Sequence, residues 1–133
     1  MTPIFLDTVG LVALWDIDDQ WHGVAERAYQ RIVSTRQSVI TTTFVLLECG
    51  NAAARRTYWE DVCALRQALE LRNEVVAPTD DDWGNAWEAY RQRRVGRAGI
   101  VDCVSFAVMR RLGIGQAFTN DRHFQEAGFE TLF

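Results

Sequence analysis

The chain has 133 residues, 48% of them hydrophobic, which is enough for one sizeable core and too little for a second domain of ordinary size. Its net charge of −4 argues against a protein that holds nucleic acid through global electrostatics, although a local basic surface is compatible with it. No stretch approaches the roughly 20 apolar residues that span a bilayer, and the N-terminus lacks the pattern of a signal peptide. We therefore expect one domain over residues 1–133, located in the cytoplasm and not in a membrane.

Short apolar runs alternate with longer amphipathic segments in the first half of the chain. Pro3–Leu6 and Ser38–Thr41 have the length and composition of buried strands. Apolar residues at helical spacing predict helices over Thr8–Trp15, His22–Val33, Thr43–Arg56 and Trp59–Leu71. The first half is therefore expected to contain two strands, each followed by a pair of helices.

The second half continues the alternation. Asp80, Asp81 and Asp82 are expected to supply the N-cap and the first-turn acids of a helix that runs to about Arg94, and Gly113 is expected to end another helix. The predicted elements are a strand over Glu74–Ala77, these helices over about 80–94 and Ile100–Leu112, a strand over Gln116–Thr119, a helical turn from Arg122, and a strand over Glu130–Phe133. Short strands separated by helices predict a parallel sheet covered on both faces.

The cysteines are odd in number and lack Cys-x-x-Cys spacing. Cys49 and Cys103 lie in apolar helical runs, and Cys63 is expected on the apolar side of the helix over Trp59–Leu71. Buried thiols are therefore favoured over a disulfide or a zinc site.

Four acidic residues lie where a folded chain does not readily accept unpaired charge. Asp7 ends one predicted strand and Asp121 closely follows another, while Glu48 and Asp102 interrupt apolar helices. A buried carboxylate is costly unless it is paired or bound to a cation, and the chain contains no lysine. In open parallel sheets, ligands bind beyond the carboxyl ends of the strands, where Asp7 and Asp121 would meet if their strands are neighbours.

Four converging carboxylates would form an oxygen-rich site that suits Mg²⁺ or Mn²⁺ and not zinc. A divalent ion in such a site can polarise a phosphodiester and activate water, so hydrolysis of a nucleic-acid backbone is the leading hypothesis. Each acid also has a local alternative. Asp7 and Asp121 could cap helices, and Glu48 and Asp102 could pair with arginines.

The same acids lie in a series of short motifs. These are Phe5-Leu6-Asp7-Thr8, then Leu47-Glu48 with Asn51-Ala52, then Ile100-Val101-Asp102 with Phe106-Ala107, and finally Thr119-Asn120-Asp121 with Phe124 and Gly128. In order and spacing they resemble the motifs of PIN-domain ribonucleases, and they are most similar to VapC-like toxins of bacterial toxin–antitoxin pairs. The resemblance covers essentially the whole chain.

The resemblance implies a PIN-like α/β fold, a three-layer α/β/α sandwich with a central parallel sheet of about five strands. It implies a Mg²⁺- or Mn²⁺-dependent endoribonuclease that blocks translation, forms a homodimer and is inhibited by a cognate antitoxin. By position, the metal ligands would be Asp7, Glu48, Asp102 and, directly or through water, Asp121. Thr119 matches a hydroxyl residue beside the site, Asn120 could assist, and Thr8 could serve either the site or the helix N-terminus.

The sequence allows two interpretations for each of two other clusters, one of arginines and one of aromatic residues. Four arginines precede Asp102. They could contact RNA phosphates, or they could simply lie at a solvated helix C-terminus, which favours cations: Arg91, Arg93, Arg94 and Arg97. On the preceding helix, three aromatic residues share one face, for which core or dimer packing is favoured over base stacking: Trp83, Trp87 and Tyr90. His123 lies near Asp121, but a metal-bound water needs no histidine base, and neither it nor His22 is assigned a role.

Two further classes of protein have a similar predicted sheet and an acidic residue at its edge. Receiver domains depend on a late lysine, and aspartate-nucleophile phosphatases need a second aspartate where this chain has Val9, so the sequence disfavours both. A non-catalytic PIN-like module that acts through a protein partner stays open as the alternative, although the four acids are all present.

Overall fold

The computed structural model describes residues 2–133, and each predicted strand and helix is present. The strands are β1 (Ile4–Leu6), β2 (Val39–Thr42), β3 (Val75–Val76), β4 (Gln116–Phe118) and β5 (Glu130–Thr131). The helices are α1 (Thr8–Trp15), α2 (His22–Ser34), α3 (Thr43–Ala53), α4 (Trp59–Leu71), α5 (Asp80–Arg91), α6 (Ile100–Leu112) and α7 (Arg122–Glu126). The largest differences from prediction are at the ends of α3 and α5, which stop earlier than expected. Arg93, with φ of 50°, adopts a left-handed conformation that cannot continue α5.

All five strands are parallel and follow the order β3-β2-β1-β4-β5. The central strand β1 pairs with β2 through Phe5 and Ile40 and with β4 through Phe5 and Ala117. The chain therefore adds strands to one side of β1 and then crosses over to add β4 on the other side. This places the topological switch point between β1 and β4, at their carboxyl ends.

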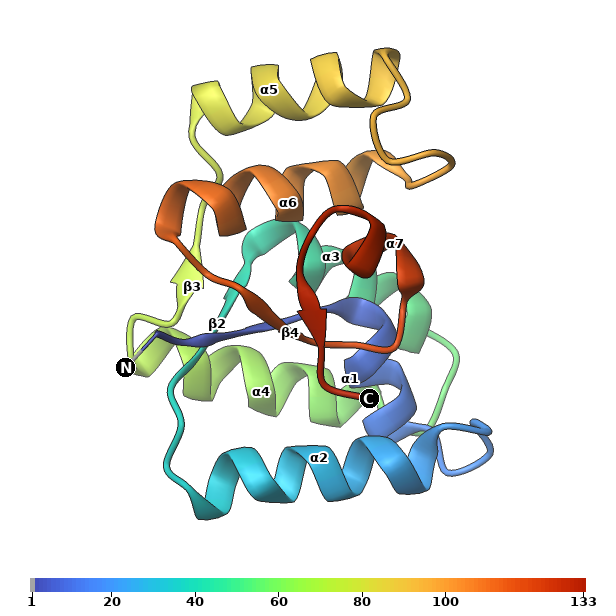
Figure 1. Ribbon diagram of the computed structural model, residues 1–133. Coiled ribbons are helices and arrows are strands. Elements are labelled where there is room, and N and C mark those ends of the chain that lie inside the picture. Colours follow the sequence, from blue (N-terminus) through green and yellow to red (C-terminus); the bar gives the residue numbers. More distant parts are fainter. Residues whose placement is uncertain (1) are drawn as a thin grey trace.

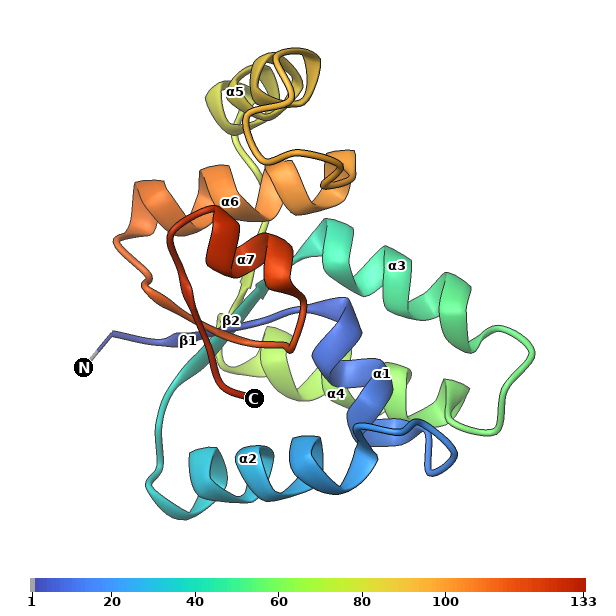
Figure 2. The same cartoon turned by 45° about the vertical axis from the view of Figure 1, so that its right-hand side comes forward.

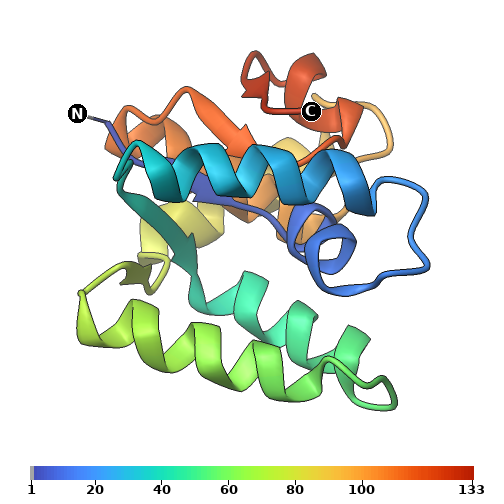
Figure 3. The same ribbon diagram turned by 90° about the horizontal axis from the view of Figure 1, so that it is seen from below.

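Helices cover both faces of the sheet. Figures 1 and 2 show α5, α6 and α7 on one side and α2 and α4 on the other, and Figure 3 shows α2 and α4 running beneath the sheet. Helix α5 packs on α6 and is the outermost element of its layer. The predicted three-layer α/β/α sandwich with a five-stranded parallel sheet is confirmed.

The core lies between these layers and explains why β1 is an unbroken apolar run. Phe5 and Leu6 are completely buried because helices cover both faces of the central strand. Phe106 of α6 and Phe124 of α7 meet edge to face at 4.9 Å between ring centroids. On α1, a Cβ at Gly10 would lie 2.1 Å from the carbonyl oxygen of Phe118. Glycine therefore lets α1 pack directly against the end of β4.

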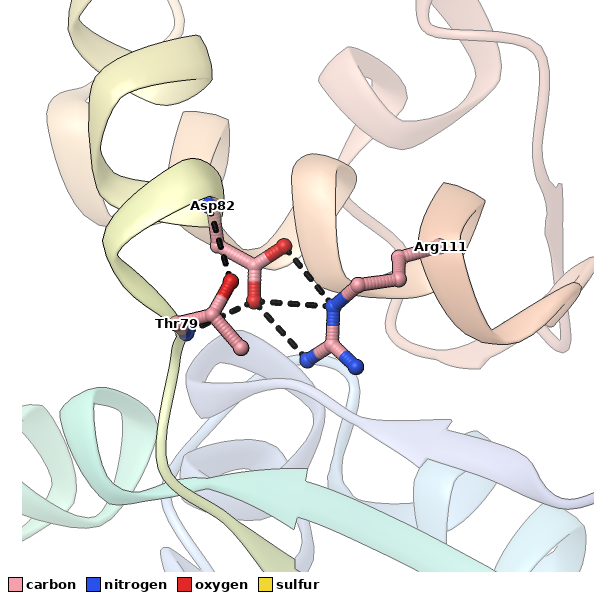
Figure 4. A network of polar contacts seen from close by, with 3 residues as sticks. All are labelled: Thr79, Asp82 and Arg111. Atoms are coloured by element: carbon pink, nitrogen blue, oxygen red, sulfur yellow. Dashed lines mark hydrogen bonds and ion pairs between the residues drawn. The ribbon is translucent and has the colours of Figure 1, made fainter.

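Helix α5 is capped and anchored differently from the prediction (Figure 4). Its N-cap is Thr79, which forms a capping box with Asp82, so the aspartates contribute first-turn charge and not the cap itself. Arg111, at the end of α6, donates from Nη2 to Asp82 Oδ2 at 2.8 Å and from Nε to Oδ1 at 3.0 Å. This bidentate pair fastens the start of α5 to the end of α6.

Trp83, Trp87 and Tyr90 are exposed on α5, so of the two packing roles predicted for them the core role is excluded and the dimer role stays a prediction. One expectation about burial is wrong. Cys63 is exposed on α4, where Val62 and Leu69 occupy the buried face instead. Cys49 and Cys103 are buried as predicted, and burial raises the pKa of the Cys49 thiol to about 12.

No helix in the described part of the chain combines the length and the apolarity that crossing a bilayer requires.

Candidate active site

The four predicted acids reach the carboxyl edge of the sheet from separate elements. Asp7 directly follows β1 and is the N-cap of α1, and Asp121 follows the neighbouring strand β4 and is the N-cap of α7. Glu48 lies on α3, which begins immediately after β2, and Asp102 lies in the first turn of α6. The acids therefore surround the switch point between β1 and β4, as the sheet order requires.

Asp7 is the most enclosed of the four, with 1% of its surface exposed. The Thr119 hydroxyl donates to its Oδ2 at 2.8 Å. The Val9 backbone N–H donates to the same oxygen at 3.4 Å, which is the N-cap contact of α1. Within residues 2–133, no hydrogen bond reaches Oδ1. One oxygen of Asp7 is therefore fixed by the protein and the other is free to bind a ligand.

Thr119 links two of the acids. Its Oγ1 donates to Asp7 and accepts the backbone N–H of Asp121 at 3.1 Å. The segment after β4 is thereby fixed relative to the end of β1, although the two acids are more than a hundred residues apart in sequence. Thr119 therefore lies beside the acids, as its motif predicts.

Glu48 is held by Thr8. The Thr8 hydroxyl donates to Glu48 Oε1 at 2.6 Å, which ties the start of α1 to α3. Of the two roles that the sequence allowed for Thr8, the contact with the acid is the one formed. For Asn120 no side-chain hydrogen bond is formed within residues 2–133, so its assisting role gains no support from the geometry.

Asp102, Asp121 and His123 bring potential ligand atoms within 4.8 Å of one another. Asp121 Oδ1 accepts the backbone N–H of His123 at 2.9 Å and lies 3.0 Å from His123 Nδ1. The sequence analysis did not assign this histidine a role. The available signal was its position two residues after Asp121, at the start of a helix that folds the imidazole back onto the acid.

The electrostatics show that these carboxylates have little protein counter-charge among residues 2–133, with His123 as the basic side chain that acts on Asp102 and Asp121. Burial raises the pKa of Asp7 to about 8, the negative charges of Asp102, Asp121 and Glu48 add to that rise, and the Thr119 hydrogen bond opposes it. The pKa of Asp102 is raised to about 6, mainly by burial and then by Asp121 and Glu48. Among the described residues, no arginine forms an ion pair with any of the four acids.

The local alternatives for the acids are thus only partly correct. Among the described residues, Glu48 and Asp102 do not pair with arginines. Asp7 and Asp121 do cap α1 and α7, but each cap uses one oxygen of its carboxylate. Capping therefore coexists with acidic side chains that no arginine neutralises. Among the described residues, the group whose ligand atoms lie close enough together for one cation is Asp102, Asp121 and His123, and Asp7 and Glu48 are not part of it.

Comparisons with known proteins agree with this geometry. The family model described as the PIN domain matches residues 4–130. The 23S rRNA-specific endonuclease VapC20 of Mycobacterium tuberculosis, from strains CDC 1551 and H37Rv, is 36% identical over 131 residues, which cover 95% of each protein. A crystal structure of VapC20 from the same species, described as a sarcin-ricin loop cleaving toxin, superposes with a TM-score of 0.77 at 32% identity, again over 95% of each chain.

Proposed function

The chain belongs to the PIN-domain family, and we propose that it is a metal-dependent endoribonuclease, the toxin of a toxin–antitoxin pair. The observation that carries the proposal is the group of four carboxylates at the switch point, with which no arginine of the described residues forms an ion pair. Because RNA is itself an anion, its phosphate cannot approach this group without a cation between them. A non-catalytic module would have no need to retain such a costly arrangement.

In this proposal Asp7, Glu48, Asp102 and Asp121 hold Mg²⁺ or Mn²⁺. A bound divalent ion supplies the polarisation of the phosphodiester and a water of lowered pKa. Thr119 and Thr8 orient Asp7 and Glu48, since each donates to one oxygen of its acid and leaves the other free. Asp7, which is almost completely buried, needs a bound cation to stay ionised at neutral pH.

The substrate class follows from the relatives. VapC20 is a 23S rRNA-specific endonuclease and a sarcin-ricin loop cleaving toxin, and we infer that this chain also cuts a structured ribosomal RNA loop and thereby blocks translation. The basic turn before α6 is the proposed phosphate contact. Arg93 and Arg97 form no ion pair within residues 2–133, whereas Arg91 is bound to Glu88 at 2.6 Å. Arg93 and Arg97 are therefore better placed than Arg91 to meet RNA.

A homodimer is proposed through the exposed aromatic face of α5. Trp83, Trp87 and Tyr90 form an edge-to-face row on this helix, with neighbouring ring centroids 5.9 and 5.6 Å apart, and Trp83 also meets Phe44 of α3 at 6.0 Å. Such a row on the outermost helix would be buried by the same face of a second copy. Trp87→Glu should yield monomers in light scattering, whereas Trp59→Glu, an exposed tryptophan on α4, should not. Monomeric wild-type protein at micromolar concentration would refute the contact.

A cognate antitoxin and a cytoplasmic location complete the proposal. The antitoxin would keep the nuclease silent, so co-expression with it should relieve growth arrest that the toxin alone causes. Growth arrest that persists in an Asp7→Asn variant would show that the toxicity does not come from cleavage.

The decisive experiment is RNA cleavage by purified protein. Wild type and Asp7→Asn are incubated with ribosomal RNA, with an isolated sarcin-ricin loop oligonucleotide and with unstructured RNA, in Mg²⁺, in Mn²⁺ and in EDTA. Cleavage that requires both the metal and Asp7 supports the nuclease, and end mapping identifies the bond. Equal cleavage by the two proteins, or none of any RNA by wild type, would contradict the proposal and favour the binding module.

A further inference from the structure

His123 is the histidine beside the acidic site, and the chain's only other histidine is His22. We propose that His123 supplies a nitrogen ligand to the metal centre at Asp102 and Asp121, and that this ligand biases the site toward Mn²⁺ over Mg²⁺. The inference rests on the proposed function, because it assumes that the acids bind a divalent ion. It goes further by adding a residue outside the four acids and by assigning a metal preference.

The first support is distance. His123 Nδ1 lies 3.0 Å from Asp121 Oδ1, and Asp102 brings a carboxylate oxygen into the same 4.8 Å group. Two adjacent ligands of an octahedral ion, each about 2.1 Å from the metal, are separated by about 3.0 Å. The imidazole and the carboxylate thus already have the spacing of neighbouring ligands on one ion.

The second support is the surroundings of the imidazole. Its side chain is 28% exposed, and Asp121 is the only side chain within residues 2–133 that it pairs with. His22 differs, because its Nδ1 lies 2.9 Å from the Ala13 carbonyl oxygen and its Nε2 lies 3.7 Å from Glu26. His22 therefore has structural partners on both ring nitrogens, whereas His123 faces the acids and solvent.

The metal preference follows from ligand chemistry. Carboxylate and water ligands suit Mg²⁺ and Mn²⁺ alike, whereas imidazole nitrogen is a softer donor that suits transition metals better than Mg²⁺. Replacing one oxygen ligand by His123 nitrogen should therefore strengthen Mn²⁺ binding more than Mg²⁺ binding. A site built from the four acids alone would discriminate less between the two ions.

Pulsed electron paramagnetic resonance of bound Mn²⁺ tests the ligand directly, since a coordinated imidazole couples its nitrogen nucleus to the metal's electron spin. Wild type, His123→Gln and the matched control His22→Gln are each loaded with Mn²⁺ without RNA. We expect a nitrogen coupling in wild type and in His22→Gln and its loss in His123→Gln. Absence of the coupling in wild type, or its persistence in His123→Gln, would overturn the inference.

Competition binding of the two metals gives an independent measurement. We expect His123→Gln to weaken Mn²⁺ binding at least about tenfold, with Mg²⁺ binding weakened clearly less. An equal loss for both ions would contradict the preference. If wild type binds Mn²⁺ with no imidazole coupling, only the inference fails. If wild type binds neither ion, the metal-dependent function fails with it. Unfolding curves of the metal-free variants check that His123→Gln is folded.

Discussion

Asp7 and Asp82 are both almost completely buried, with 1% and 2% of their surface exposed, yet their pKa values shift in opposite directions. At Asp82 the hydrogen bonds and charge of Arg111, with the Thr79 capping box, lower the pKa. At Asp7 burial and three neighbouring acids raise it to about 8. Burial alone therefore does not distinguish a structural aspartate from one that we propose to bind a metal. The distinction is whether the protein provides the counter-charge.

The two regions also differ in how they are held. The Asp82 pair joins two helices of the outer layer, and the oxygens of its carboxylate are both occupied by Arg111. The Asp7 region is held by hydroxyl and backbone donors that each use one carboxylate oxygen. The first arrangement is complete without a ligand, whereas the second leaves carboxylate oxygens without a protein partner, and we propose that a cation completes it.

The largest expected effect separates the two aspartates by activity. Asp7→Asn should reduce cleavage at least about 10³-fold, because it removes a charged group from the centre of the site. Asp82→Asn should leave cleavage per folded molecule within a few-fold of wild type. Initial rates on the same RNA, normalised to folded protein by circular dichroism, provide the measurement. Comparable losses in the two variants would remove the proposed difference between the regions.

The second effect is the pH dependence of metal-free stability. The folded state keeps protons on Asp7, with pKa about 8, and on Asp102, with pKa about 6, that the unfolded state loses near its value of 3.8. Stability should therefore be greatest near pH 4 and should fall as pH rises to about 8, by about 1.4 kcal/mol per pH unit where Asp7 alone differs. Urea unfolding in EDTA measures the slope.

Asp7→Asn serves as the control for that slope, because it removes the group that titrates between pH 6 and 8. Its metal-free stability should be nearly flat over this interval and at least equal to wild type at pH 8. The pH dependence of stability that Asp82 contributes has the opposite sign. Its lowered pKa contributes stability above pH about 4 that is lost only in more acidic solution. An unchanged slope in Asp7→Asn would mean that another group titrates.

The third effect concerns packing beneath the site. Gly10→Ala should destabilise the protein by about 3 kcal/mol, since its Cβ would overlap the Phe118 carbonyl and push α1 away from β4. Gly84→Ala, in the middle of α5 with no atom within 4 Å of the added Cβ, should instead stabilise by up to about 1 kcal/mol. Thermal and urea unfolding compare the two. Equal effects would show that α1 can move freely at the site.

The smallest expected effect concerns the ion pair between Asp82 and Arg111. Arg111→Met should destabilise the protein, because it leaves Asp82 without its partner, while the 38% exposure of the Arg111 side chain lets water screen part of the loss. Arg122→Met, which removes a solvent-exposed contact of 4.0 Å, should change stability by less than about 0.5 kcal/mol. If Arg111→Met changes the free energy of unfolding as little as Arg122→Met, the pair does not stabilise the outer layer.

Much of the fold could be predicted from local patterns. The apolar run of β1 and the helical periodicities identified every element, because burial on both faces of a sheet or one face of a helix leaves a regular trace in the sequence. Helix ends were less predictable. The end of α5 depends on the left-handed Arg93, and its start depends on a capping box that Thr79 and Asp82 form together.

The exposure of particular faces could not be predicted in the same way. Trp83 and Trp87 have the spacing of a buried helix face, yet they are exposed, and the buried residues of α5 are Asp82 and Ala86. A charged residue thus occupies the inner face and aromatic residues the outer one. Hydrophobicity alone gives the reverse assignment.

Local patterns in the sequence predicted that four acids follow strands or lie in apolar helices and that the sheet is parallel, and the composition showed that no lysine could neutralise the acids. The packing of strands and helices then set which aspartate received an arginine and which did not. Charge pairing depends on distances of a few ångströms between side chains, and residues such as Asp82 and Arg111, or Asp7 and Thr119, become neighbours only when the strands and helices pack. The same packing set His123 against Asp121, a contact whose separation the sequence spacing alone did not specify.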